Sequence, residues 1–194
     1  MSKINSFHIS DNLDQYEFAR DNCFEFVITD IDNLVRAGVD PELAATSADI
    51  IKNGSEAIRL GVQQSTVPFF SQANIELRMG NGVVKAAGLP TFPDGSIVVN
   101  DYIGLGTKSV LMAWQALSYN VKNQVVGKMS EYKKDCYLLE YDPDMTTVIL
   151  TWKLHGCFIS ALQQSDFNRE QGNKRTVTAT ISYDWAEPVI DASL

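Results

Sequence analysis

The amino-acid sequence predicts a mainly β fold, an antiparallel β-barrel or sandwich with one packed α-helix and a helical insertion. Two observations lead to this fold class. Several stretches alternate apolar and polar residues and are separated by turn residues, as the strands of an antiparallel sheet are. Only one stretch has a clear apolar stripe at helical spacing. The length of 194 residues fits a single domain over 1–194, and the composition, 45% apolar and 21% charged, is that of a globular chain.

The first predicted strand covers 24–28, where large apolar side chains occupy alternate positions. Residues 30–56 break this pattern and are interpreted as an insertion outside the core. Inside it, Asp40 in the N-cap position, followed by proline and glutamate, predicts a helix over 41–52. From Ala57 onward we expect the chain to return to β structure.

A long hairpin is predicted over 72–88, because two strand-like runs flank Asn81-Gly82, the dipeptide typical of tight hairpin turns. Its first strand alternates strictly, with Ile75, Leu77 and Met79 on one face and Asn74, Glu76 and Arg78 on the other. We expect the apolar face to pack back on the domain and the polar face to contact water, because period-two alternation allows only these two faces. Arg78 is expected to be offset by Glu76.

The clearest helix is predicted over 107–119, with Thr107 as its N-cap. Its apolar stripe consists of Val110, Leu111, Trp114 and Leu117. Two strands over 136–141 and 147–154 are predicted to meet across a turn that contains proline. A final strand is predicted over 176–185, and the residues on its apolar face are Val177, Ala179, Ile181, Tyr183 and Trp185.

No catalytic, metal-binding or cofactor-binding residues are predicted, and the chain is interpreted as a protein that is not an enzyme. His8 and His155 are accompanied neither by a G-x-S-x-G nucleophile motif nor by the short spacings of metal ligands. We expect His155 to be a surface histidine or one with satisfied hydrogen bonds. The three cysteines, Cys23, Cys136 and Cys157, are widely spaced and odd in number, so buried free thiols are expected.

The segment Gly104–Ser109 superficially resembles a phosphate-binding loop, but Thr107 separates Gly106 from Lys108 and the first glycine of that motif is missing. It is therefore interpreted as a joint between a strand and a helix. The net charge of −8 argues against attractive binding to nucleic acid, which is held mainly by Lys and Arg. No apolar run approaches the length of about 20 residues that a membrane span needs, so no membrane partner is expected.

Several stretches of the chain, in order and spacing, resemble the tail tube protein family of contractile-tail bacteriophages. They are Phe18–Arg20 with Asn22 and Phe24, Gln72–Ala87, Gly88–Asp101, the helix with Trp114-Gln115, Glu131–Lys134, and Val177–Trp185. Together they span most of residues 16–187. The resemblance implies a tail-tube fold whose subunits form hexameric rings, and the rings stack into the inner tube of a contractile tail.

The resemblance also implies a function and a set of partners. The chain would be a structural virion protein of the tail, assembled in the host cytoplasm, and the tube would be a conduit for DNA ejection. The implied partners are other copies of the chain, a tail sheath protein, a tape-measure protein, baseplate and tail terminator proteins, and DNA that passes without specific binding. The hairpin would line the tube, which makes Asn74, Glu76 and Arg78 the predicted lumen-facing residues, and an acidic wall would repel DNA.

Residues 30–56 are longer than the turn that the family has at this position. The family is also related to the inner tube proteins of phage-like contractile injection systems and of type VI secretion, and the sequence leaves these alternatives open. Two rival classes also remain open, a monomeric ligand-binding β-barrel and a nucleotide-dependent enzyme. The tube hypothesis predicts self-assembly, whereas a ligand-binding β-barrel would stay monomeric. A nucleotide-dependent enzyme would bind ATP, which the tube hypothesis does not predict.

Overall fold

The computed structural model describes residues 18–31, 54–103, 106–170 and 172–189. The fold is mainly β, and its strand pairs are antiparallel. The main sheet has the strand order β1-β8-β9-β10-β5-β2, with β11 also paired to β9. Its strands are β1 (Phe24–Ile28), β2 (Val62–Ser65), β5 (Gly95–Asn100), β8 (Lys134–Tyr141), β9 (Val148–Gln164), β10 (Thr176–Ser182) and β11 (Trp185–Val189).

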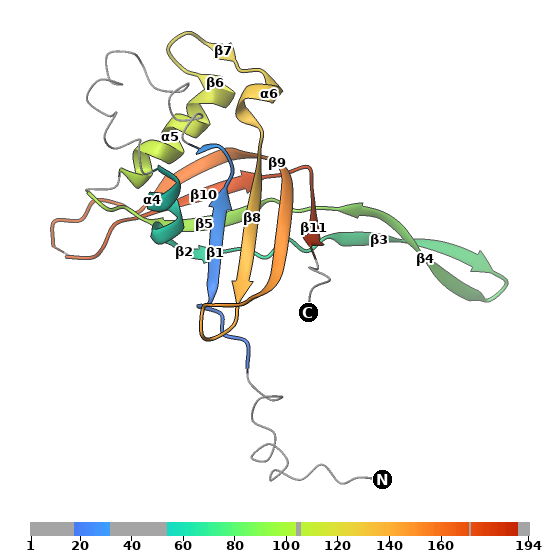
Figure 1. The fold of residues 1–194 in the computed structure, drawn as a ribbon. Coiled ribbons are helices and arrows are strands. Elements are labelled where there is room, and N and C mark those ends of the chain that lie inside the picture. The colour runs from blue at the N-terminus through green and yellow to red at the C-terminus, as the bar shows by residue number, and fades with distance from the viewer. Residues whose placement is uncertain (1–17, 32–53, 104–105, 171, 190–194) are drawn as a thin grey trace, which may run out of the picture.

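Two smaller sheets and the helices lie outside this main sheet. The hairpin strands β3 (Ser71–Met79) and β4 (Gly82–Thr91) form one small sheet, and β6 (Tyr119–Asn120) and β7 (Val125–Val126) form the other. The helices with described bounds are α4 (Gly54–Gly61), α5 (Thr107–Ser118) and α6 (Met129–Tyr132). In Figure 1, α5, α6 and the β6–β7 sheet lie at one end of the molecule, and β3–β4 projects sideways from it.

The strand β9 belongs to two parts of the main sheet. Its first part pairs with β8 and β11, and its last part pairs with β10. Gly156 lies between the two parts with φ +67°, a left-handed conformation that favours glycine. In Figure 1, the strands β1, β8 and the first part of β9 cross over β10, β5 and β2, so the sheet folds over on itself. The core lies between these two layers.

The core is built from the faces that alternation predicts. On β10, Val177, Ala179 and Ile181 are buried, whereas the residues between them are partly exposed. Helix α5 packs against β9, and its stripe Val110, Leu111 and Trp114 is at most 1% exposed. The Trp114 indole Nε1 donates a hydrogen bond to the Tyr132 carbonyl at 2.9 Å, so α5 is also tied to α6.

The expectation that β structure begins at Ala57 is wrong, because α4 occupies Gly54–Gly61. Its buried positions are Gly54, Ala57, Ile58 and Gly61, which follow the i, i+3, i+4, i+7 spacing of a helix face. β structure therefore begins at Val62. The helix predicted over 41–52, with its N-cap Asp40, lies outside the described residues.

Thr107 is not the N-cap of α5. Gly106 takes that position with φ 59° and ψ 27°, and no side chain caps the helix. Thr107 is instead the first helical residue, 1% exposed, and its Oγ1 has no hydrogen-bond partner among the described residues. The left-handed glycine turns the chain sharply enough to point the threonine side chain into the core.

The final strand is also not continuous over 176–185. β10 ends at Ser182 and β11 begins at Trp185, because the Asp184 N–H bonds the His155 carbonyl at 2.9 Å and turns the chain onto the first part of β9. The Asp184 carboxylate accepts from Lys133 at 2.7 and 2.8 Å. Trp185 is consequently 42% exposed and does not share the buried face of β10.

Candidate functional site

The hairpin β3–β4 is the most unusual surface of the chain. All nine residues of β3 are exposed, and in β4 only Ala86 and Gly88 are partly covered. Figure 1 shows the hairpin reaching well beyond the folded body. It continues from β2 and β5, which pair with each other inside the main sheet. The body therefore holds the hairpin at its base while the rest extends into solvent.

Aromatic contacts fix the base of the hairpin. The Phe69 ring meets Trp152 edge-on with centroids 5.3 Å apart, and the Phe70 ring lies 5.8 Å from Phe92. Phe92 in turn contacts Tyr183 at 6.2 Å. These contacts join the segment before β3 to β9 and to the end of β10. They set the direction in which the hairpin leaves the body.

A register shift between Gln72 and Asn74 places a β-bulge near this base. The extra residue is on β4, where Gly88 and Leu89 together face Ala73, and a Cβ atom at Gly88 would sit 2.5 Å from the Ala73 carbonyl oxygen. Only glycine lets the two backbones approach this closely. A bulge increases local twist, so the outer hairpin is turned relative to the strands that hold it.

The register divides the hairpin into two unlike faces, because directly opposite residues of an antiparallel pair lie on the same face. The apolar face carries Ile75, Leu77, Met79, Val84 and Ala86. The polar face carries Asn74, Glu76, Arg78 and Lys85, together with Val83 and Ala87. The three residues singled out from the sequence, Asn74, Glu76 and Arg78, thus lie on one face.

The apolar face does not pack back on the domain as expected from the sequence. Ile75, Leu77 and Met79 are 53%, 49% and 72% exposed. The physical reason is length: β3 and β4 run beyond the body, so nothing among the described residues covers them. An apolar surface of this kind normally marks an interaction site.

Lys85 is the residue of the polar face that the sequence interpretation missed. It lies directly opposite Glu76, whereas Arg78 lies opposite Val83. The signal was available, because a two-residue turn at Gly80-Asn81 fixes the pairing of 76 with 85. The face therefore carries two basic groups and one acidic group, and the acidity of the whole chain is located elsewhere.

Each strand of the hairpin also has an unpaired edge among the described residues. β3 and β4 pair only with each other, and β1 and β2 are the end strands of the main sheet. An unpaired edge presents backbone N–H and C=O groups to any strand that can approach. The hairpin thus combines an uncovered apolar face with open edges, which is the arrangement of a surface that pairs with another chain.

His155 is held in place by contacts with neighbouring side chains. Its Nε2 lies 3.2 Å from Glu187 Oε1 and its Nδ1 lies 3.6 Å from Asp135 Oδ2. Its ring stacks on Trp185 with centroids 3.9 Å apart. These contacts link β9 to β8 and β11. His8 lies outside the described residues.

Neither a metal site nor a disulfide is found in the described part of the chain. There, no group of three or more His, Cys, Asp or Glu side chains could hold a metal ion. Cys23, Cys136 and Cys157 are free and buried, as predicted. Burial raises the pKa of the Cys136 thiol, and the neighbouring Cys157 raises it further, so this thiol stays protonated.

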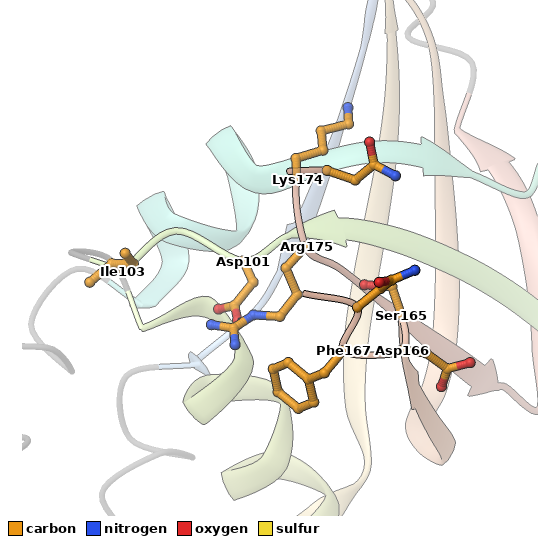
Figure 2. A pocket seen from close by; sticks show the side chains of 9 residues that line it. Asp101, Ile103, Ser165, Asp166, Phe167, Lys174 and Arg175 are labelled. Carbon is orange, nitrogen blue, oxygen red and sulfur yellow. The ribbon is translucent and has the colours of Figure 1, made fainter. Parts of the chain in front are cut away.

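A surface cavity of about 660 Å³ lies between the end of β5 and the loop that joins β9 to β10. Figure 2 shows the side chains that line it. Asp101, 7% exposed at its side chain, lies 2.5 Å from Arg175 Nε, and its backbone N–H bonds the Arg175 carbonyl at 3.0 Å. The Arg175 guanidinium lies over the Phe167 ring at 5.7 Å. The two charges therefore engage each other and clamp the loop to β5, which is a structural role.

The segment considered as a phosphate-binding loop does not present its lysine to a cavity. Lys108 Nζ donates to Gln164 Oε1 at the end of β9, which ties the start of α5 to the sheet. Gly104 and the residue after it lie outside the described residues. Among the helices that the structure describes, none is long and apolar enough to cross a bilayer.

Neither a model of a protein family nor a curated protein sequence matches the chain. Several solved structures do match the chain. The tube-terminating cap of the anti-feeding prophage aligns at 14% identity and a TM-score of 0.62, over 89% of this chain and 91% of that one. A second match is a chain of the sheath–tube complex, in its extended state, of PVC, an extracellular contractile injection system. It aligns at 14% identity and a TM-score of 0.62, over 96% of this chain and 99% of that one.

The sheath/tube terminator of the same injection system aligns at 15% identity and a TM-score of 0.62, over 90% of this chain and 99% of that one. Likenesses at such low identity show the fold. The antiparallel β fold with packed helices that the sequence and its resemblance to tail tube proteins predicted is therefore confirmed.

Proposed function

We propose that this chain is a structural subunit of the inner tube of a contractile, tail-like assembly, forming rings that stack into a hollow conduit. The observation that carries the proposal is the hairpin β3–β4, whose apolar face and open edges are uncovered in the single chain. A chain that keeps such a surface needs a partner, and a second copy offers the same open edges. The fold shared with a tube cap and with a chain of a sheath–tube complex supports this choice.

Ring formation resolves the exposure of the hairpin. Each copy contributes its β3–β4 strands to a barrel shared by all copies, which closes the edges. The polar face with Asn74, Glu76 and Arg78 then lines the lumen, together with Lys85, and the face with Leu77 is covered by neighbouring copies. Six copies per ring follow from the resemblance to tail tube proteins. No catalysis is part of this role.

The assembly has further partners in this proposal. A sheath protein surrounds the tube, baseplate and terminator proteins bind its ends, and a tape-measure protein sets its length. The protein is located in the tail, after assembly in the host cytoplasm. Cargo passes through the lumen without specific binding, and in a bacteriophage that cargo is DNA.

A second candidate is the inner tube of a phage-like contractile injection system or of a type VI secretion apparatus. The likeness to chains of PVC and of the anti-feeding prophage favours an injection system, whose cargo need not be DNA. Particles purified from the native source distinguish the two, because a phage particle contains a DNA genome and an injection particle does not.

Negative-stain electron microscopy of the purified chain tests the proposal. We expect rings and tubes with six-fold symmetry, alone or on a baseplate seed, and no ATP binding. A chain that stays monomeric at high concentration with a seed present would overturn the tube function. Saturable binding of a small apolar ligand to that monomer would favour the ligand-binding β-barrel instead.

A further inference from the structure

The two ends of strand β8 carry surfaces of opposite charge. A single residue separates α6 from the start of β8, and the turn to β9 follows the last residue of β8. Figure 1 shows α6 with β6 and β7 at one end of this strand and the β8–β9 turn at the other. Eight residues of strand separate the two surfaces by about 25 Å. The hairpin β3–β4 projects sideways and belongs to neither end.

The surface before β8, here called the basic pole, consists of β6, β7 and the start of α6. Every residue from Tyr119 to Val126 is exposed. Its apolar members include Val121, Val126 and Met129, which are 79%, 71% and 67% exposed. Its charges are Lys122 and Lys128 against Glu131, which lies 3.9 Å from Lys128. These three described charges sum to +1, whereas the whole chain has a net charge of −8.

The surface after β8, here called the acidic pole, combines the β8–β9 turn with the segment just before β1. The Tyr141 N–H bonds the Cys23 carbonyl at 2.8 Å, which holds the two segments together. Among the described residues, the charges of this pole are Asp21, Asp142 and Asp144 against Arg20, which sum to −2. Exposed apolar side chains accompany them: Met145, Val148 and Ile149 are 51%, 37% and 49% exposed.

We propose that the basic pole of one copy docks on the acidic pole of another copy, and that this contact stacks one ring on the next. Each pole has apolar side chains among its charges, and only unlike poles attract. Two unlike poles at opposite ends make a head-to-tail contact, which repeats without closing. This inference rests on the proposed tube function and deepens it.

Charge reversal tests the contact. One variant carries Lys122→Glu and Lys128→Glu, which makes both of its poles acidic. A second carries Asp21→Lys and Asp144→Lys, which makes both basic. We expect each variant alone to form rings while its yield of sedimenting tubes falls at least about tenfold, because an attraction becomes a repulsion at every subunit. An equal mixture of the two is expected to recover most of the tubes, with the rings alternating.

Controls separate this inference from its premise. The pair Arg169→Glu and Glu170→Lys, in the exposed loop between β9 and β10, keeps tube yield at the wild-type level. Circular dichroism melting curves verify that every variant folds. If the wild-type chain forms neither rings nor tubes, the tube function fails. Three results would overturn the pole contact while the tube function stands, provided that the wild type forms tubes. In these results the pole variants lose rings as well as tubes, form tubes at the wild-type yield, or fail to recover tubes when the two are mixed.

Discussion

The strands β3 and β10 have the same sequence pattern and opposite surroundings. Both alternate apolar and polar residues along their length. On β10 the apolar positions Ala179 and Ile181 are 0% and 2% exposed, whereas on β3 the equivalent Ile75 and Leu77 are 53% and 49% exposed. Alternation thus identifies which face of a strand must be covered. It does not say whether the same chain or another copy covers that face.

A matched pair of truncations gives the largest contrast in stability. Ile181→Ala removes a buried side chain from the core, and we expect it to lower the free energy of unfolding by about 2–5 kcal/mol. Leu77→Ala, on the exposed hairpin, should change it by less than about 0.5 kcal/mol. Urea denaturation of the two monomeric variants measures both values. Equal losses would mean that the hairpin is covered within the single chain.

Leu77→Asp sharpens the comparison by changing assembly rather than folding. The charge is placed on the apolar face of the hairpin, which is exposed in the monomer but covered in the proposed ring. We expect an unchanged melting curve and no rings in electron micrographs. Arg78→Asp, on the polar face of the same strand, is the control and should still form rings. Rings from Leu77→Asp together with none from Arg78→Asp would reverse the facing of the hairpin.

A smaller effect is expected where β8 meets β1 in the body. The Tyr141 hydroxyl donates to Glu25 Oε2 at 2.9 Å, and Glu25 also pairs with Arg59. Tyr141→Phe should lower the free energy of unfolding by about 0.5–1.5 kcal/mol at pH 7, because the carboxylate loses a donor. The measurement is urea denaturation between pH 7 and pH 11.

The pH dependence of this difference has a definite sign. Burial, and then the hydrogen bond to Glu25, raise the pKa of Tyr141 in the folded chain. Its contribution is therefore complete below about pH 10, the ordinary value for tyrosine, and is lost as the pH rises through the raised pKa. The stability gap between wild type and Tyr141→Phe should narrow above pH 10. A gap that widens there would contradict the assignment.

The smallest effect on folding is expected for Glu76→Lys. The new lysine faces Lys85 across the hairpin, a like-charge pair that costs a few tenths of a kcal/mol, so folding and rings persist. The lumen face then carries only basic groups. Assembled tubes should bind a double-stranded DNA fragment about two- to tenfold more tightly at low salt, with the difference lost at high salt. The exposed Glu170→Lys serves as the matched control, and equal DNA binding by both variants would remove Glu76 from the lumen.

Local rules predicted much of the body of the molecule. The apolar faces of β1, β10 and α5 follow periods of 2 and 3.6, and these faces are buried. The predicted helix boundaries are wrong where the backbone conformation of a glycine, rather than a side-chain pattern, decides where a helix begins. The left-handed Gly106 shifts the start of α5, and the helix over Gly54–Gly61 was missed because its face contains two glycines. Side-chain patterns carry little information about such positions.

The candidate site was predictable in its location and faces but not in its surroundings. The turn dipeptide and the alternation located the hairpin and its polar residues, and the same register contained Lys85. That the apolar face would be uncovered in the single chain did not follow from the sequence. Whether a hairpin extends beyond the body depends on where the other strands end, which is a property of the whole fold.

The length of β9 has a mechanical consequence. Its 17 residues run through both parts of the main sheet, with Gly156 as the bend between them. A force that pulls on the hairpin passes through β5 to β10, and from β10 along the ladder into β9. It then loads β8 and β11 in shear, where many backbone hydrogen bonds must break together. Because one continuous strand pairs with β10 in one layer and with β8 and β11 in the other, we expect tension on the hairpin to spread over both layers.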